Sequence, residues 1–230
     1  MNESALKALV DLRDRTIQKS RIAFGNRISA VEGGRDTADE HTMNIFNSWN
    51  ERFTMMEAQL DSDISDLIED VPIIDALVSI KGIGKILAAK LVSAIDIEQA
   101  DTVSALWRYA GYAVINGERE KPTKGEKLHY NAELKKNLYL VATSFMRCGS
   151  PYREIYDSAR EYYDVKHPEW TKGHSHNAAL RKMTKLFLSH LWEHWRTLEG
   201  LPLREAYVFD QLGHDHKQSR FDFGWPPINA

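Results

Sequence analysis

The chain has 230 residues, of which 43% are hydrophobic and 27% charged, as in a globular protein of one or two domains. Neither an apolar run long enough for a membrane span nor a signal-peptide pattern is present, so we expect a cytoplasmic protein without a membrane partner. The one cysteine, Cys148, excludes a disulfide within the chain. The net charge of −3 excludes a surface that is basic throughout, so any nucleic-acid contact must be a local patch.

Two long helices are predicted first, and together they form an N-terminal arm over residues 1–70. In the first, over residues 3–32, apolar side chains recur three, four or seven positions apart. Thr37 and Glu40 form a capping box for the second helix. The apolar residues of that helix follow a heptad spacing: Phe46, Trp49, Phe53, Met56, Leu60, Ile64 and Leu67. The arm is either an internal antiparallel hairpin or a coiled coil that joins two copies of the chain, and heptads do not distinguish the two.

A domain boundary is expected near residue 70, where a cluster of acidic residues precedes Pro72. Proline cannot continue a helix but suits the first turn of a new one. We therefore predict a mainly α protein with a second helical domain over residues 71–199. Residues 200–230 have an irregular pattern, and their aromatic side chains predict that this tail packs against the body or a partner.

Apolar helical runs flank the most informative stretch of the second domain, Lys81-Gly82-Ile83-Gly84-Lys85. The pattern predicts a helix-hairpin-helix over about residues 72–96. Gly82 and Gly84 can take positive φ and let a phosphate approach the backbone closely. The N–H groups that begin the second helix attract anions, and Lys81 and Lys85 add positive charge. The alternative is a tight corner between helices with solvated lysines, but the coincidence of these features favours phosphate binding.

Residues 112–131 lack a helical period and contain the turn-forming pair Asn116-Gly117, so a loop or a short β-hairpin is predicted there. Because the segment follows the hairpin, its basic residues are candidate nucleic-acid contacts: Arg119, Lys121, Lys124 and Lys127. The alternative is an exposed loop whose charges are only solvated.

Three more helices are predicted after this loop. The first ends at Gly149, the second begins at Ser150-Pro151, and the long final helix is capped by Asn177. Three basic residues are expected on the outer face of the final helix near its start: Arg181, Lys182 and Lys185.

The order of these parts is similar to that of a known family. The segments that carry the likeness, after the Gly-Ile-Gly hairpin, are Leu106-Trp107-Arg108-Tyr109-Ala110-Gly111, Lys135-Lys136-Asn137-Leu138, Pro151-Tyr152 and Asn177-Ala178-Ala179-Leu180. Over residues 72–196 the chain resembles the C-terminal domain of the DEDD-type insertion-sequence transposases, a group that includes bridge-RNA-guided recombinases. The resemblance implies a helix-hairpin-helix domain that holds DNA. The arm is similar in kind to the coiled-coil insertion of that family.

Two departures from the family pattern concern catalysis. The ribonuclease-H-like domain with its four metal-binding acids is not found, and the acids at 61–70 do not replace it. The nucleophilic serine of the family's loop is also missing from residues 112–131, where Thr123 is the only aliphatic hydroxyl. Thr123 could attack a phosphodiester if a neighbour deprotonated it, with Lys124 or Lys127 stabilising the charge. A turn residue is the commoner role for such a threonine, so the sequence leaves enzymatic activity open.

The nine histidines raise the question of a zinc site. His190 and His194 are one helical turn apart, but neither a cysteine partner nor a His-Glu-x-x-His pattern accompanies them. We therefore expect no metal, and a hydrogen-bonded core histidine is the commoner role. Two further pairs are expected in loops: His174 with His176, and His214 with His216.

Three functions remain open from the sequence. The first is a DNA-binding protein related to transposase C-terminal domains, with RNA as the alternative partner, which forms homo-oligomers through the arm and needs no cofactor. The second is an enzyme that cleaves DNA or transfers strands, for which Mg²⁺ would be the cofactor. The third is a non-enzymatic interaction module, which the net acidic charge favours.

Overall fold

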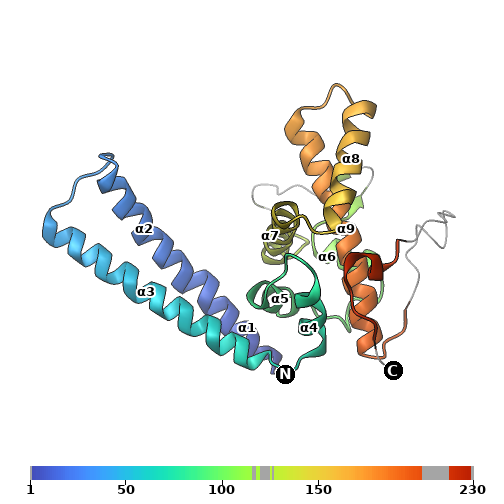
Figure 1. Cartoon of the computed structure of the whole chain (residues 1–230), viewed down its shortest axis with the longest axis horizontal. Helices are drawn as coiled ribbons and strands as arrows, with labels where there is room; N and C mark the ends of the chain where they lie inside the picture. The colour runs from blue at the N-terminus through green and yellow to red at the C-terminus, as the bar shows by residue number, and fades with distance from the viewer. Residues whose placement is uncertain (1, 116–117, 120–124, 126, 204–217, 229–230) are drawn as a thin grey trace. The chain divides into compact units, whose positions relative to one another are not determined.

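The computed structural model describes residues 2–115, 118–119, 125, 127–203 and 218–228. The predicted mainly α fold, with a helical hairpin at the N-terminal end, is confirmed (Figure 1). The chain divides into two compact units, residues 1–69 and residues 70–230. We call them the arm and the body.

The arm consists of two antiparallel helical segments (Figure 1). The first runs from residue 3 to residue 32, as predicted, but it contains a π-helical turn. Its parts are α1 (Glu3–Asp11), the π-helical η1 (Leu12–Ile17) and α2 (Gln18–Glu32), and the returning helix is α3 (Glu40–Leu67). A π-helical turn widens the helix locally and is frequent where side chains are re-aimed for a specific contact. Here it carries Arg13 and Asp14, which are both buried.

The start of α3 differs from the predicted capping box. Asp39, and not Thr37, is the N-cap, and its side chain accepts a hydrogen bond from the N–H of Thr42 at 2.7 Å. Hydrogen bonding with the Thr42 side chain and, less, with its backbone N–H lowers the pKa of Asp39. The carboxylate also lies at the positive end of the helix dipole, so it is a stronger cap than a hydroxyl two residues earlier would be.

The heptad seam of α3 is packed at one end and open at the other. Leu60 and Ile64 are buried, and Phe24 of α2 stacks on Phe53 with ring centres 5.8 Å apart. Trp49 and Met56 remain 43% and 47% exposed. The arm therefore closes as an internal hairpin, while part of the predicted seam stays accessible.

The described part of the body contains the remaining helices and a two-stranded sheet (Figure 1). Its elements are α4 (Pro72–Ser79), α5 (Lys85–Val92), α6 (Val103–Tyr109), β1 (Val114–Ile115), β2 (Glu118–Arg119), α7 (Ala132–Cys148), α8 (Tyr152–Lys166), α9 (Lys172–Leu198) and the 3₁₀ turn η2 (Arg220–Phe223). Helix α9 is the axis, because α4, α6, α7 and α8 all pack on it. Its buried stripe includes Met183, Phe187 and Leu191.

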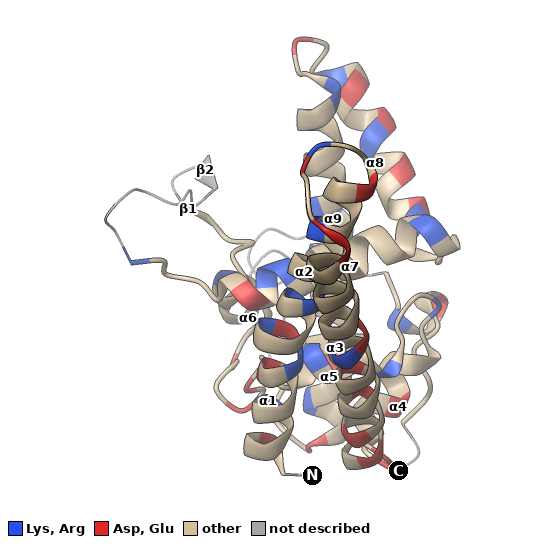
Figure 2. Cartoon of the chain, turned by 90° about the vertical axis from the view of Figure 1, so that its left-hand side faces the viewer, with Lys and Arg blue, Asp and Glu red and all other residues tan. Residues whose placement is uncertain are grey.

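Helix α8 lies beside the N-terminal part of α9. Its outer surface alternates basic and acidic residues, as Figure 2 shows. Arg153 pairs with Asp157 and Arg160 pairs with Asp164, each one helical turn apart. This surface is therefore close to neutral.

Helix α9 begins five residues before the predicted cap. Thr171 is the N-cap, and its hydroxyl accepts from the N–H of His174 at 3.2 Å. Asn177 lies inside the helix, where its side chain donates to the carbonyl of Gly173 at 2.8 Å. Both residue types are good caps, and the sequence pattern alone does not rank them.

The described end of the tail packs into the body. Phe223 and Trp225 are buried, and the indole N–H of Trp225 donates to the hydroxyl of Tyr152 at 2.9 Å. Tyr152 in turn stacks on Phe145 of α7, with ring centres 4.8 Å apart. Ser79, the last residue of α4, donates to the carbonyl of Gly224 at 3.1 Å. The tail thus contacts the helix that leads into the predicted hairpin.

His190 and His194 of α9 belong to this core, whereas His174 and His176, which were expected in a loop, lie in the first turns of the same helix. His190 is hydrogen-bonded to the Tyr152 hydroxyl at 2.7 Å and to the Gln218 carbonyl at 3.0 Å, so both ring nitrogens have partners. Burial lowers the pKa of His194 to about 4. Among the described residues, no group of three His, Cys, Asp or Glu side chains could hold a metal ion. His214 and His216 lie outside these residues, and no described helix is both long and apolar enough to cross a membrane.

Candidate nucleic-acid interface

The predicted helix-hairpin-helix consists of α4, a five-residue turn and α5. Pro72 occupies the first turn of α4, where its missing N–H costs no hydrogen bond. The turn is closed by a hydrogen bond from the N–H of Ile83 to the carbonyl of Ile80 at 3.0 Å. Both isoleucine side chains are buried, with 0% and 4% exposed. The two apolar anchors fix the turn to the core and leave its polar backbone at the surface.

Gly82 is required by packing against α7. Its φ is +108°, a conformation that side-chain-bearing residues rarely adopt. A Cβ atom at this position would lie 2.8 Å from the sulfur of Cys148. The hydroxyl of Ser144 donates to the carbonyl of Gly82 at 2.6 Å. From the sequence, we expected a phosphate to approach Gly82 closely. In the structure α7 makes this close approach.

Gly84 has a different role from the predicted one. Its φ is −96°, so the expectation of positive φ is wrong here. It is the N-cap of α5, and no atom of the described residues lies within 4 Å of a Cβ built on it. A glycine cap offers no side-chain acceptor, so the first N–H groups of α5 have no capping bond. The open side of the turn is thus an unblocked helix N-terminus.

Two exposed lysines flank this open helix start. Lys81 precedes Gly82 in the turn, and Lys85 is the first residue of α5. Neither forms an ion pair with a described residue, so their charges add to the positive end of the helix dipole. Lys81, Gly84 and Lys85 are the predicted site residues that the structure brings together at one surface.

The loop after α6 contains the expected short β-hairpin. Val114 pairs with Arg119 and Ile115 pairs with Glu118, antiparallel. Arg119 therefore lies in β2, and Lys127 is exposed just before α7. The other predicted residues of this loop lie outside the described residues: Lys121, Thr123 and Lys124.

Two cations of α9 are not on a free outer face, contrary to the prediction. Arg181 donates to the carbonyls of Tyr112 and Ala113, the latter at 2.9 Å, and so fixes the base of the loop. The ammonium of Lys185 lies 3.8 Å from the ring centre of Trp107. Burial and, to a smaller extent, the charge of Arg181 lower the pKa of Lys185 to about 8. The reason for the difference is packing, because α6 and the loop cover this side of α9.

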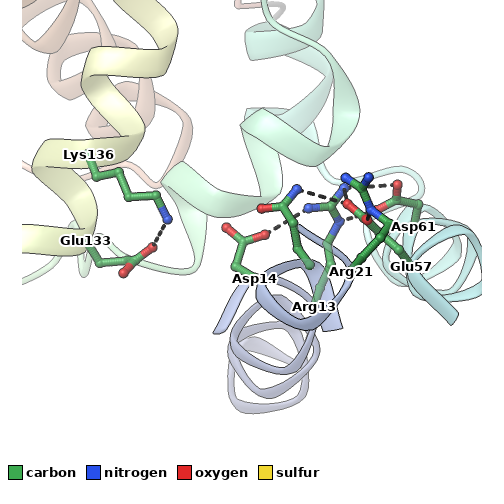
Figure 3. Close-up of polar contacts among 8 residues, drawn as sticks. Arg13, Asp14, Arg21, Glu57, Asp61, Glu133 and Lys136 are labelled. Carbon is green, nitrogen blue, oxygen red and sulfur yellow. Dashed lines mark hydrogen bonds and ion pairs between the residues drawn. The ribbon is translucent and has the colours of Figure 1, made fainter. Parts of the chain in front are cut away.

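The arm carries basic residues too, and the two that face α3 are neutralised within the arm. Arg13 forms ion pairs with Asp14 at 2.9 Å, with Glu57 at 3.0 Å and with Asp61 (Figure 3). Arg21 also pairs with Glu57. Cations held in this way by carboxylates of the neighbouring helix have little attraction left for an external anion.

A comparison with known families places a match on the body. Residues 74–157 match the model of the Transposase IS116/IS110/IS902 family. No curated protein and no solved structure gave a match to the chain.

The matched segment runs from within α4 into α8 and includes the whole turn between α4 and α5. It also includes α6, the loop and α7, whose Ser144 and Cys148 hold the turn in place. The match relates this part of the chain to transposases of that family. It covers neither the arm nor α9, although the resemblance noted in the sequence extends to residue 196.

Proposed function

We propose that the chain is a DNA-binding protein of the transposase-related class, which holds the phosphate backbone at the turn between α4 and α5. The observation that carries this proposal is the open N-terminus of α5 at Gly84 with Lys81 and Lys85 beside it. The transposase match over the same segment supports DNA as the ligand.

The physical basis is backbone recognition without base contacts. The uncapped N–H groups of α5 would donate to phosphate oxygens, and the helix dipole favours a negative charge at that point. Two lysines add Coulombic attraction, which salt screens. Such contacts position a protein on nucleic acid and do not read sequence. Affinity should therefore be similar for unrelated duplexes and should fall steeply as salt is raised.

The decisive test is a mobility shift on unrelated DNA duplexes with the Lys81→Glu/Lys85→Glu double variant. We expect binding to be abolished at moderate salt. At low salt, where residual binding is measurable, the slope of log K against log salt should fall by about 2, because two phosphate contacts are lost. Unchanged affinity and slope would remove the hairpin from the mechanism.

The matched control is Lys7→Glu/Lys19→Glu, which changes two exposed lysines of the arm and alters the net charge by the same amount. Retained binding in this control, beside loss in the hairpin variant, would assign the effect to the hairpin. Equal loss in both would mean that only net charge matters.

We further propose that the arm joins two copies of the chain. Trp49 and Met56 keep 43% and 47% of their surfaces exposed, and Met55 keeps 73%. Exposed apolar residues in a cluster are typical of protein contacts. The size of the protein in solution, measured by light scattering, should fall to that of one chain in the Trp49→Glu/Met56→Glu variant. A wild-type protein that is already monomeric would refute this contact.

The transposase match also keeps a catalytic function as the second candidate. In this version the chain would cleave DNA or transfer strands with Mg²⁺, alone or with a separate ribonuclease-H-like partner, and Thr123 would be the nucleophile. A cleavage assay with Mg²⁺ should then show activity that the Thr123→Ala variant lacks. Equal activity in both proteins would clear Thr123 of a role.

A further inference from the structure

A groove of about 1050 Å³ opens on the body, away from the turn between α4 and α5. Its walls come from the first turns of α7 and of α9 and from Tyr112 and Tyr130, which lie before β1 and before α7. Its volume is close to the upper end of the range for pockets that bind one small molecule, about 300–1,000 Å³. Sequence reasoning did not find it, because the walls come from segments far apart in the chain.

The groove is positively charged. Lys135, Lys136 and Arg181 line it, and its lining contains no Asp or Glu among the described residues. The ammonium of Lys135 lies 4.2 Å from the ring centre of Tyr130, and Arg181 is held by backbone carbonyls. Lys136 pairs at 3.0 Å with Glu133, as Figure 3 also shows. That pair is partly exposed, and exposed pairs exchange readily for a stronger anion.

Aromatic rings alternate with these cations. Tyr139 lines the groove and is 52% exposed. His174 is exposed at the start of α9 and stacks on Trp170 with ring centres 4.0 Å apart. Tyr130 forms a further part of the wall. Exposed rings beside cations are the combination that holds unpaired bases and their phosphates.

The backbone adds to the positive potential. Helix α7 begins at Ala132 and helix α9 begins at Lys172, and the first turns of both line the groove. The N-termini of α7, with 17 residues, and of α9, with 27 residues, thus both lie at this groove.

We propose that this groove binds a short segment of single-stranded nucleic acid. Lys135, Lys136 and Arg181 contact its phosphates, and Tyr139 and His174 stack on its bases. A duplex is a poorer ligand, because its bases are already stacked inside and their faces cannot reach a tyrosine in a concave site. An acidic peptide would use the cations but not the exposed rings. The proposal takes its class of ligand from the proposed function but needs no contact at Lys81 or Lys85.

The test uses the full chain and fluorescence anisotropy with a labelled oligothymidylate of twelve nucleotides. Tyr139→Ala should weaken binding about tenfold through the loss of one stacked base, and Tyr139→Phe should restore it. Lys136→Glu should weaken binding further and reduce its salt dependence. Binding to a duplex through the hairpin should be unchanged by Tyr139→Ala.

The body offers a matched control on α8. Tyr162 is 50% exposed and the ammonium of Lys166 lies 5.0 Å from its ring centre, outside the groove. Tyr162→Ala and Lys166→Glu should leave oligothymidylate binding unchanged. Equal effects of the Tyr139 and Tyr162 variants, or no effect of either, would overturn the proposal. Displacement of the oligonucleotide by polyglutamate as readily as by unlabelled oligothymidylate would also overturn it, since the groove would then accept any polyanion.

The hairpin variant Lys81→Glu/Lys85→Glu separates the two sites. Loss of duplex binding with retained oligothymidylate binding would support both proposals. Retention of both would refute the hairpin and leave the groove standing. Equal loss of both would show one shared surface and refute a separate groove. A parallel titration with oligouridylate determines whether the strand is DNA or RNA.

Discussion

Basic residues differ in their surroundings between the arm and the body. In the arm, Arg13 is buried between α1–α2 and α3, where Glu57 and Asp61 hold its guanidinium (Figure 3). In the body, Lys81 and Lys85 are exposed beside an uncapped helix start. This difference favours the proposed phosphate contact at the turn of the body over one at the Arg13 cluster of the arm. A count of basic residues does not locate it.

The arm cluster joins the two segments of the hairpin. Burial alone would lower the pKa of Arg13, but the hydrogen bonds that it donates to Asp61 and Asp14, with the charges of Asp61 and Glu57, raise it overall. Arg13 therefore carries its positive charge in the folded arm. A buried ion pair is weak evidence for net stability, but removal of one partner leaves the other charges buried and uncompensated.

The largest expected effect is that of Arg13→Ala. This variant removes the cation that Asp14 and Glu57 share, although Glu57 keeps Arg21 as a partner, and we expect the arm to lose about 3 kcal/mol of unfolding free energy. Arg15→Ala is the control, because Arg15 forms an exposed pair with Asp11 and should cost less than about 1 kcal/mol. Urea unfolding followed by circular dichroism would measure both. Similar losses in the two variants would contradict a buried role for Arg13.

A second effect concerns the pH dependence of stability that follows from the buried imidazole of His194. The pKa of His194 is about 4 in the folded chain because of burial and, less, the charge of Arg220, against about 6.5 when unfolded. Between these values the unfolded chain binds a proton that the folded chain does not. Stability should therefore fall as the pH falls from about 6.5 to about 4, by up to about 3 kcal/mol. The difference in unfolding free energy between wild type and His194→Gln should shrink over this window, and a constant difference would refute the assignment.

A third effect separates the two glycines of the turn. Gly82→Ala should cost about 2 kcal/mol, since alanine at positive φ is strained and its Cβ would meet the sulfur of Cys148. Gly84→Ala should cost no more than about 1 kcal/mol, because φ is negative and the space is open. Cys148→Ala should recover part of the loss in the Gly82→Ala protein. Thermal unfolding would compare wild type, the two glycine variants and the Gly82→Ala/Cys148→Ala protein. Equal losses of stability for the two glycines would contradict the difference between a packed Gly82 and an open Gly84.

Local pattern predicted the elements well but not their partners. The helical hairpin, the turn at Gly82 and the short β-hairpin all follow from periodicity and turn residues near in sequence. The reason for Gly82 depends on Ser144, 62 positions away, and no local signal connects the two. The groove likewise joins Lys135 to Arg181, which only the packing of α7 on α9 brings together.

The predictions of two helix N-caps were wrong for a different reason. Asp39 and Thr171 cap where Thr37 and Asn177 were predicted, because several good capping residues stand close together. Capping preferences differ by only about 1 kcal/mol, so the packing of the rest of the helix decides which residue is used. The missing side-chain cap at Gly84 could have been predicted from the sequence. A glycine before an apolar helical run leaves the first N–H groups of the helix without a side-chain acceptor.

The smallest change in stability should come from Gly84→Asp, and it tests the open side of the turn most directly. Aspartate would cap α5 and raise the unfolding free energy by about 0.5 kcal/mol. The same carboxylate would occupy the N–H groups and repel a phosphate, so we expect duplex affinity to fall at least tenfold in a protein that is no less stable. Gly84→Asn caps without charge and should lie between wild type and Gly84→Asp in affinity. Wild-type affinity in the aspartate variant, measured by mobility shift, would place the phosphate contact away from the start of α5.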